Sequence, residues 1–180
     1  MKADEQRALL EGMGLQLPLT TDTSGFEYEA DRYGKAIAAA NKLRPNFVVV
    51  CGDMCNNKID PADELVEIKR ITATLNQDIP MYWVAGNHDV TNEPTQETLA
   101  NYRERFGPDF YSFDREGSHF IVLNSTVWQQ PKNVPDELDK QIKFLRADLN
   151  GARELGSNNI VLFTHHPLFL TNVDEGDSWL

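Results

Sequence analysis

Three short polar clusters in this sequence carry side chains that can bind metal ions or transfer protons. They are Gly52-Asp53, Gly86-Asn87-His88-Asp89 and Thr164-His165-His166. A carboxylate such as Asp53 can bridge two divalent cations, while the amide of Asn87 and the imidazole of His165 can complete one coordination shell without adding charge. Mixed oxygen and nitrogen ligands suit Mn, Fe or Zn better than Ca, which prefers oxygen alone. The residue types therefore favour a site for two divalent metal ions.

Such a site would have a definite chemistry. Two cations held about 3.5–4 Å apart clamp a phosphate and lower the pKa of a shared water toward about 7, so that a metal-bridging hydroxide could attack phosphorus in line. His88 adjoins a candidate ligand, and Asp89 could hold its ring as an imidazolium. We expect His88 to stabilise developing charge or to protonate the leaving oxygen. The residues alone leave a plainer alternative open, in which Gly86-Asn87 is an ordinary turn and His88 packs in the loop.

The elements that must position these clusters are short apolar, β-branched runs, which predict strands buried on both faces. The runs cover residues 47–51, 81–85 and 160–163, directly before the three clusters. Ligands collect where the carboxyl ends of parallel strands meet. Placing the three strands side by side would therefore bring Asp53, Asn87 and His165 together.

Helical periodicity separates the strands. The predicted helices cover residues 29–43, 60–75, 95–106 and 136–155. Two further strand patterns flank Arg115-Glu116-Gly117 and predict a β-hairpin. His119, at the start of the second of these strands, is expected to be structural. Strands that alternate with helices predict an α/β domain with much parallel sheet.

The bulk composition excludes several classes of protein. The 180 residues are 41% hydrophobic and 25% charged, which is ordinary for a globular domain. The formal net charge of −11 argues against binding to nucleic acid, which needs clustered Lys and Arg. No apolar run reaches the roughly 18 residues of a membrane span, and Met1 to Glu5 do not begin a signal peptide. We therefore expect a cytoplasmic protein with no membrane or nucleic-acid partner.

The two cysteines, Cys51 and Cys55, are too few for a disulfide framework. Cys51 ends an apolar run and is expected to be a small buried residue. A Cys-x3-Cys pair without further Cys or His nearby also makes a poor zinc site. Neither cysteine is therefore a candidate ligand.

In order and residue type, the three clusters resemble the signature of calcineurin-like metallophosphoesterases. That family has the motif order Asp-x-His, Gly-Asp-x-x, Gly-Asn-His-Asp/Glu, a single His and Gly-His-x-His. The block from Gly86 to Asp89 matches the third motif in full. Further stretches are similar to calcineurin-like phosphoesterase domain-containing Ser/Thr protein phosphatases. These stretches are Phe47 to Asp53, Leu123 to Ser125 and His165 to Leu170.

The resemblance implies a four-layer α-β-β-α sandwich and an enzyme that hydrolyses phosphate monoesters, with phosphoserine or phosphothreonine in proteins as its expected substrate. It implies that Asp53 bridges two divalent ions, that Asn87 and His165 bind the second ion, and that His88 is the catalytic histidine, with Asp89 beside it. The stretch Ala3-Asp4-Glu5-Gln6 is similar to the Ala-Asp-Pro-Gln form of the first motif. Asp4 and Gln6 are thereby implied as ligands of the first ion.

The sequence departs from the family's pattern at both ends. Only three residues precede Asp4, where the family has its first strand, and Trp179-Leu180 end the sequence before any Gly-His-x-His. We therefore expect residues 1–180 to form a partial domain, incomplete in its first strand and carboxyl-terminal part, with an impaired metal site. The alternatives are a phosphodiesterase or nucleotide hydrolase, which would use the same metal core, and a non-catalytic scaffold that binds partners.

Overall fold

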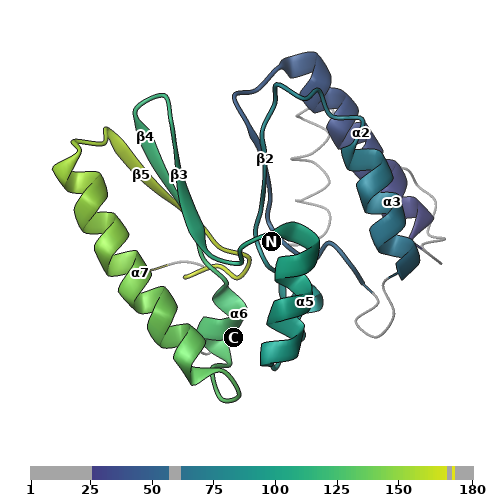
Figure 1. Cartoon of the computed structure of the whole chain (residues 1–180). Coiled ribbons are helices and arrows are strands. Elements are labelled where there is room, and N and C mark those ends of the chain that lie inside the picture. Colours follow the sequence, from purple (N-terminus) through teal and green to yellow (C-terminus); the bar gives the residue numbers. More distant parts are fainter. Residues whose placement is uncertain (1–25, 57–61, 170–171, 173–180) are drawn as a thin grey trace.

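The computed structural model of the chain describes residues 26–56, 62–169 and 172. Two β-sheets face each other and helices cover the outer face of each, so that the layers run helix, sheet, sheet, helix (Figure 1). The predicted α-β-β-α arrangement is therefore confirmed. None of the helices in these described ranges is both long enough and apolar enough to cross a bilayer.

The first sheet consists of two parallel strands, β1 (Val48–Val50) and β2 (Met81–Trp83). Helices α2 (Glu27–Leu43) and α3 (Ala62–Thr72) cover its outer face (Figure 1). Between them lies a cluster of buried apolar side chains, Ile37, Ile71, Leu75 and Ile79, against which Val48 and Met81 pack. The apolar stripe read from the sequence is thus the face that these helices bury.

The second sheet has three strands, in the order β3, β4, β5. Their bounds are Tyr111–Arg115, Ser118–Val122 and Asn159–Phe163. β3 and β4 form the predicted hairpin, and its two-residue turn has φ of 49° at Glu116 and 73° at Gly117. Positive φ at both central residues is the type I′ geometry that matches the twist of the paired strands. The chain then crosses through α7 (Pro135–Glu154) on the outer face and returns as β5, parallel to β4 (Figure 1).

The position of β5 corrects the expectation from the sequence. The three strands that precede the polar clusters do not share a sheet, because β5 pairs with β4 rather than with β1 or β2. Among the described strands β5 has one neighbour only, and Ile160, Val161 and Leu162 are 36–37% exposed instead of buried. An apolar run in an edge strand looks the same in the sequence as one in a central strand.

An aromatic layer fills the space between the sheets. The rings of Phe47 and Phe113 meet edge to face with centroids 5.3 Å apart, and Tyr82 stacks on Phe113 at 3.5 Å. The Tyr111 hydroxyl accepts the Trp83 N–H at 3.0 Å and donates to the Trp83 carbonyl at 2.9 Å. Tyr111 therefore satisfies backbone groups of β2 from the opposite sheet.

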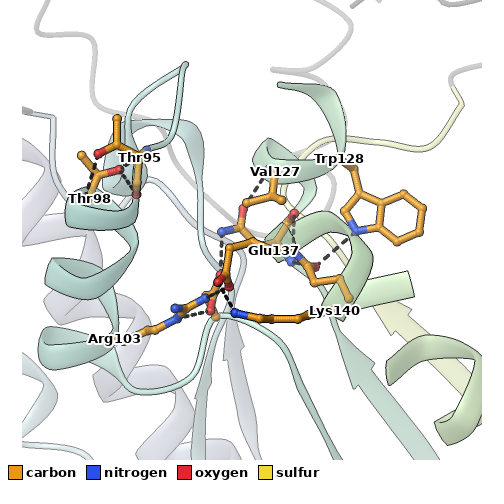
Figure 2. A network of polar contacts seen from close by, with 10 residues as sticks. Thr95, Thr98, Arg103, Val127, Trp128, Glu137 and Lys140 are labelled. Atoms are coloured by element: carbon orange, nitrogen blue, oxygen red, sulfur yellow. Dashed lines mark hydrogen bonds and ion pairs between the residues drawn. The ribbon is translucent and has the colours of Figure 1, made fainter. Parts of the chain in front are cut away.

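A buried ion-pair network joins α5 (Gln96–Phe106) to α7 (Figure 2). The Arg103 guanidinium donates to Asp109 and to Glu137, each at 2.6 Å, and Lys140 donates to Glu137 at 2.6 Å. The side chains of Asp109 and Glu137 are only 2% and 3% exposed. Burial raises the pKa of Glu137, but the bonds from Lys140 and Arg103 outweigh it and hold the pKa below its ordinary value. The two acids are thus buried as paired carboxylates.

His119 on β4 bridges two carboxylates, Asp114 on β3 and Asp148 on α7. Its two ring nitrogens each lie 2.8 Å from one carboxylate oxygen. A carboxylate only accepts, so both bonds need a doubly protonated ring. Burial lowers the pKa of His119, but Asp148 and Asp114 raise it more, so the pKa lies above its ordinary value of 6.5. The structural role expected for His119 agrees with these contacts.

Replacing Tyr111 by Phe should lower the free energy of unfolding by about 1–3 kcal/mol, because the backbone groups of Trp83 lose their partner. Tyr82→Phe is the matched control, since the Tyr82 hydroxyl makes no hydrogen bond with the described residues and its ring keeps its stacking. Urea unfolding measures both variants. Equal losses of unfolding free energy in the two variants would contradict the role of the Tyr111 hydroxyl as a bridge between the sheets.

The contribution of His119 to stability should depend on pH. Since its pKa is raised in the folded chain, the contribution is complete below the ordinary pKa and is lost as pH rises through the folded pKa. The difference in unfolding free energy between wild type and His119→Gln should therefore be larger at about pH 5.5 than at about pH 9. The same difference at both pH values would show that the ring is not held as a cation.

Candidate metal centre

The loops that follow β1 and β2 lie directly against each other. A Cβ atom on Gly52, whose φ is 89°, would come within 2.7 Å of the Gly86 nitrogen and of Nδ1 of His165. A Cβ atom on Gly86 would come within 2.3 Å of the Asp53 nitrogen and of Oδ1 of Asp53. Neither glycine can therefore be replaced without moving the loops apart. Asp53 itself has a φ of 56°, a left-handed conformation that Asp tolerates better than most residues.

The carboxylate of Asp89 holds these two loops together. Oδ2 accepts the N–H groups of Gly86 and Asp53, each at 2.9 Å, and Oδ1 accepts those of Met54 at 2.8 Å and Cys55 at 3.3 Å. Burial raises the pKa of Asp89 and the Asp53 carboxylate adds to this, while the backbone donors act in the opposite direction. One side chain thus satisfies four backbone donors from both loops.

Asp53, Asn87 and His165 converge beside these loops. Nε2 of His165 lies 3.1 Å from Oδ1 of Asn87 and 3.4 Å from Oδ2 of Asp53. Nδ1 of His165 lies 2.7 Å from the Cys51 carbonyl, which can only accept, so Nδ1 carries a proton and, in the tautomer with that proton alone, Nε2 presents a lone pair. Nδ2 of Asn87 donates to Asn92 at 2.7 Å, which turns Oδ1 toward His165.

Three atoms that can act as metal donors face one another: Nε2 of His165, Oδ1 of Asn87 and Oδ2 of Asp53. Lone pairs at such distances repel one another unless a cation lies among them or the ring takes a second proton. Mixed oxygen and nitrogen donors suit Mn, Fe or Zn. In the described residues no three His, Cys, Asp or Glu side chains lie together in a way that could hold a metal ion. The present set differs because its third donor is an amide. The set fits one divalent ion.

The ligands expected for a first metal ion, Asp4 and Gln6, lie outside the described residues. The remaining carboxylate oxygen of Asp53, Oδ1, accepts the backbone N–H of His88 at 3.0 Å. The bridging role of Asp53, and with it the second ion of the pair, stays a prediction.

His88 lies on the short helix α4 (Asn87–Val90), next to the candidate ligand Asn87. Its Nδ1 is buried and makes no hydrogen bond with the described part of the chain. The sequence suggested that Asp89 holds this ring, but the hydrogen bonds of Asp89 go to backbone donors instead. The geometry gives Asp89 the task of fixing the loops, and a catalytic part for it stays a prediction.

Two further side chains, His166 and Ser125, lie beside the candidate donors. His166, whose role the sequence left open, directs Nδ1 to the Ser125 hydroxyl at 2.9 Å rather than toward Asp53. Ser125 was not identified from the sequence as a site residue, although it ends the Leu-Asn-Ser stretch after β4.

The two cysteines differ in exposure. Cys51 is exposed, contrary to the prediction, because the strand ends at Val50, whereas Cys55 is buried.

A cavity of about 200 Å³ adjoins Asp53 between α2, α3 and the end of β1. Its lining includes the apolar side chains of Tyr33 and Ile68 and the acidic residues Glu29 and Glu67. Among the described residues that line it there is no Lys or Arg to pair with an anion. The cavity is therefore not favoured as a site for the phosphate group of a substrate.

Replacing Asp89 by Asn should lower the free energy of unfolding by about 2–4 kcal/mol, because an amide donor would then face backbone donors that need an acceptor. Asp31→Asn is the matched control, since the exposed pair of Asp31 with Lys35 is worth roughly 0.5 kcal/mol or less. Thermal and urea unfolding measure both variants. An Asp89→Asn protein with the unfolding free energy of wild type would contradict the role of this carboxylate in holding the loops.

Comparison with known proteins identifies the chain's family. The family model described as calcineurin-like phosphoesterase matches residues 19–180. Serine/threonine-protein phosphatase CPPED1 of Homo sapiens, like that of Pongo abelii, is 34% identical over 165 residues, which are 88% of this chain and 52% of the relative. Purple acid phosphatase 13 of Arabidopsis thaliana is 34% identical over 93 residues, 44% of this chain and 16% of the relative. The chain thus spans about half the length of the CPPED1 relatives. It belongs to the calcineurin-like phosphoesterase family, whose members generally use divalent metal ions.

Proposed function

We propose that the protein is a metal-dependent phosphoesterase that hydrolyses phosphate monoesters, with phosphoserine and phosphothreonine of proteins as its substrate class. The convergence of Nε2 of His165, Oδ1 of Asn87 and Oδ2 of Asp53 carries this proposal. These acceptors fit a divalent cation in a chain whose family consists of phosphoesterases. The substrate class is supported by the relatives named serine/threonine-protein phosphatase. Because those relatives are about twice as long, the proposal concerns the whole protein.

Two divalent ions, of Mn, Fe or Zn, would ionise a shared water near neutral pH and clamp the phosphate oxygens. Asp53 would bridge the two ions, with Asn87 and His165 holding the second and Asp4 and Gln6 holding the first. The hydrogen bonds to Cys51 and Asn92 already fix which atoms of His165 and Asn87 face this position. Hydrogen bonds within the chain therefore support this orientation of the two donors.

His88 would act on the substrate itself. Its backbone N–H is tied to Asp53, so the residue is fixed relative to the bridging carboxylate. Its buried Nδ1 has no partner among the described residues, so no hydrogen bond within that part of the chain occupies this nitrogen. Protonation of the leaving oxygen by His88 is the step that this position supports, since an alkoxide departs slowly without a proton.

Two variants separate metal binding from catalysis. Asn87→Ala should weaken Mn²⁺ binding about tenfold or more, because one donor is lost. His88→Ala should keep the metal but slow hydrolysis of a phosphoserine peptide by about 10²–10⁴-fold, and should slow p-nitrophenyl phosphate, whose leaving group needs no proton, far less. Calorimetric titration with Mn²⁺ and steady-state rates in excess Mn²⁺ measure these effects, with exposed Asn46→Ala as the control for Asn87.

Other outcomes would point elsewhere. Faster turnover of bis(p-nitrophenyl) phosphate than of the monoester would favour a phosphodiesterase or nucleotide hydrolase. Metal binding without turnover of any ester would favour a partner-binding scaffold. An equal rate for wild type and His88→Ala on the phosphoserine peptide would remove His88 from the mechanism.

A further inference from the structure

Ser125 connects two distant parts of the chain at the edge of the metal centre. It begins helix α6 (Ser125–Gln129), is 5% exposed, and contacts His166, which lies 41 positions later. The hydroxyl oxygen lies 3.0 Å from the His166 backbone nitrogen and 2.9 Å from Nδ1 of its ring. A hydroxyl has one donor and two acceptor positions. It can therefore accept the backbone N–H and donate to the ring, which gives His166 one fixed orientation.

The orientation of His166 bears directly on His165. The two rings meet edge to face, with centroids 4.8 Å apart and an interplanar angle of 82°. The Thr164 hydroxyl donates to the His166 carbonyl at 2.8 Å, so the short turn around His165 is fixed on both sides. With Nδ1 held by Cys51, the ring of His165 has one plane and one direction available. That direction points Nε2 at Asn87.

Ser125 is itself held by buried groups. The side chain of Asn124 accepts the N–H groups of Thr126 and Val127 and so caps α6. It also donates to the buried Asp109, whose other oxygen is held by Arg103 in the network of Figure 2. The hydroxyl of Ser125 therefore starts from a rigid position. A flexible serine could not orient a neighbouring ring.

We propose that Ser125 is a positioning residue of the metal centre, which holds His166 and thereby fixes the ring of His165 toward Asn87 and Asp53. The proposal rests on the proposed function for its role in metal binding, but the ring geometry that it explains is given by contacts within the chain. The hydroxyl of Ser125 contacts His166 rather than the candidate donors. It acts through His166 alone.

The test compares Ser125→Ala with Ser112→Ala, a matched loss of a hydroxyl that bonds Asp148 on α7 instead. Loss of a group that orients a ligand typically costs about 10- to 100-fold in metal affinity. Ser125→Ala should lower the Mn²⁺ affinity by that factor, while Ser112→Ala leaves it unchanged and Ser125→Thr, which keeps a hydroxyl, restores it in part. Folded Ser125→Ala protein with wild-type affinity would overturn the proposal.

NMR spectra of the histidine rings, recorded without added metal, test the positioning role of Ser125 independently of metal affinity. The chain has four histidines, so ¹H–¹⁵N spectra of the rings can be assigned one by one. His165 should be protonated at Nδ1 in wild type and become a mixture of tautomers in Ser125→Ala, with no change in Ser112→Ala. An unchanged His165 spectrum in Ser125→Ala would overturn the proposal. If the wild-type chain binds no Mn²⁺ but Ser125→Ala still changes the His165 tautomer, the positioning role is supported and the proposed function is contradicted.

Discussion

The candidate site depends on one carboxylate that holds two loops together. Asp89 accepts four backbone N–H groups, two on each oxygen, from the segments that follow β1 and β2. This close approach is possible only because Gly52 and Gly86 have no side chain. Once the loops are joined, Asp53 and Asn87 have little freedom left, since both adjoin residues that Asp89 holds. An acid within a candidate catalytic motif can thus bind backbone N–H groups rather than take part in the reaction.

The third donor comes from the other sheet, so the site also depends on how the sheets face each other. His165 follows β5 of the second sheet, yet its Nδ1 bonds the Cys51 carbonyl at the end of β1. The rings of Phe47, Tyr82 and Phe113 set the separation of the sheets along the strands. The aromatic layer and the metal donors are therefore two parts of one interface. Close packing of this kind passes small displacements on to the site.

Local patterns in the sequence were sufficient for the elements but not for their pairing. The runs at 47–51 and 81–85, each followed by a glycine, correctly located β1 and β2, after which Asp53 and Asn87 lie. The sheet that contains β5 was missed, because pairing between Val122 and Phe163 is a long-range choice that periodicity does not record. The task of Asp89 was missed for a similar reason, since its partners Met54 and Cys55 lie about 35 positions away. Ser125 was missed because a serine after a strand has many ordinary explanations.

The donor types also explain how an acidic chain would receive an anionic substrate. With a formal net charge of −11, the protein as a whole repels phosphate. Yet among the three converging donors only Asp53 would bring a charge to a bound metal ion, because an amide and a metal-binding imidazole are neutral ligands. Two divalent ions carry about four positive charges, so few carboxylate ligands leave a positive field where the phosphate binds. More carboxylates would hold the metal more firmly but would cancel that field. In the proposed site, an amide and an imidazole at these positions would give up some metal affinity in exchange for attraction to phosphate.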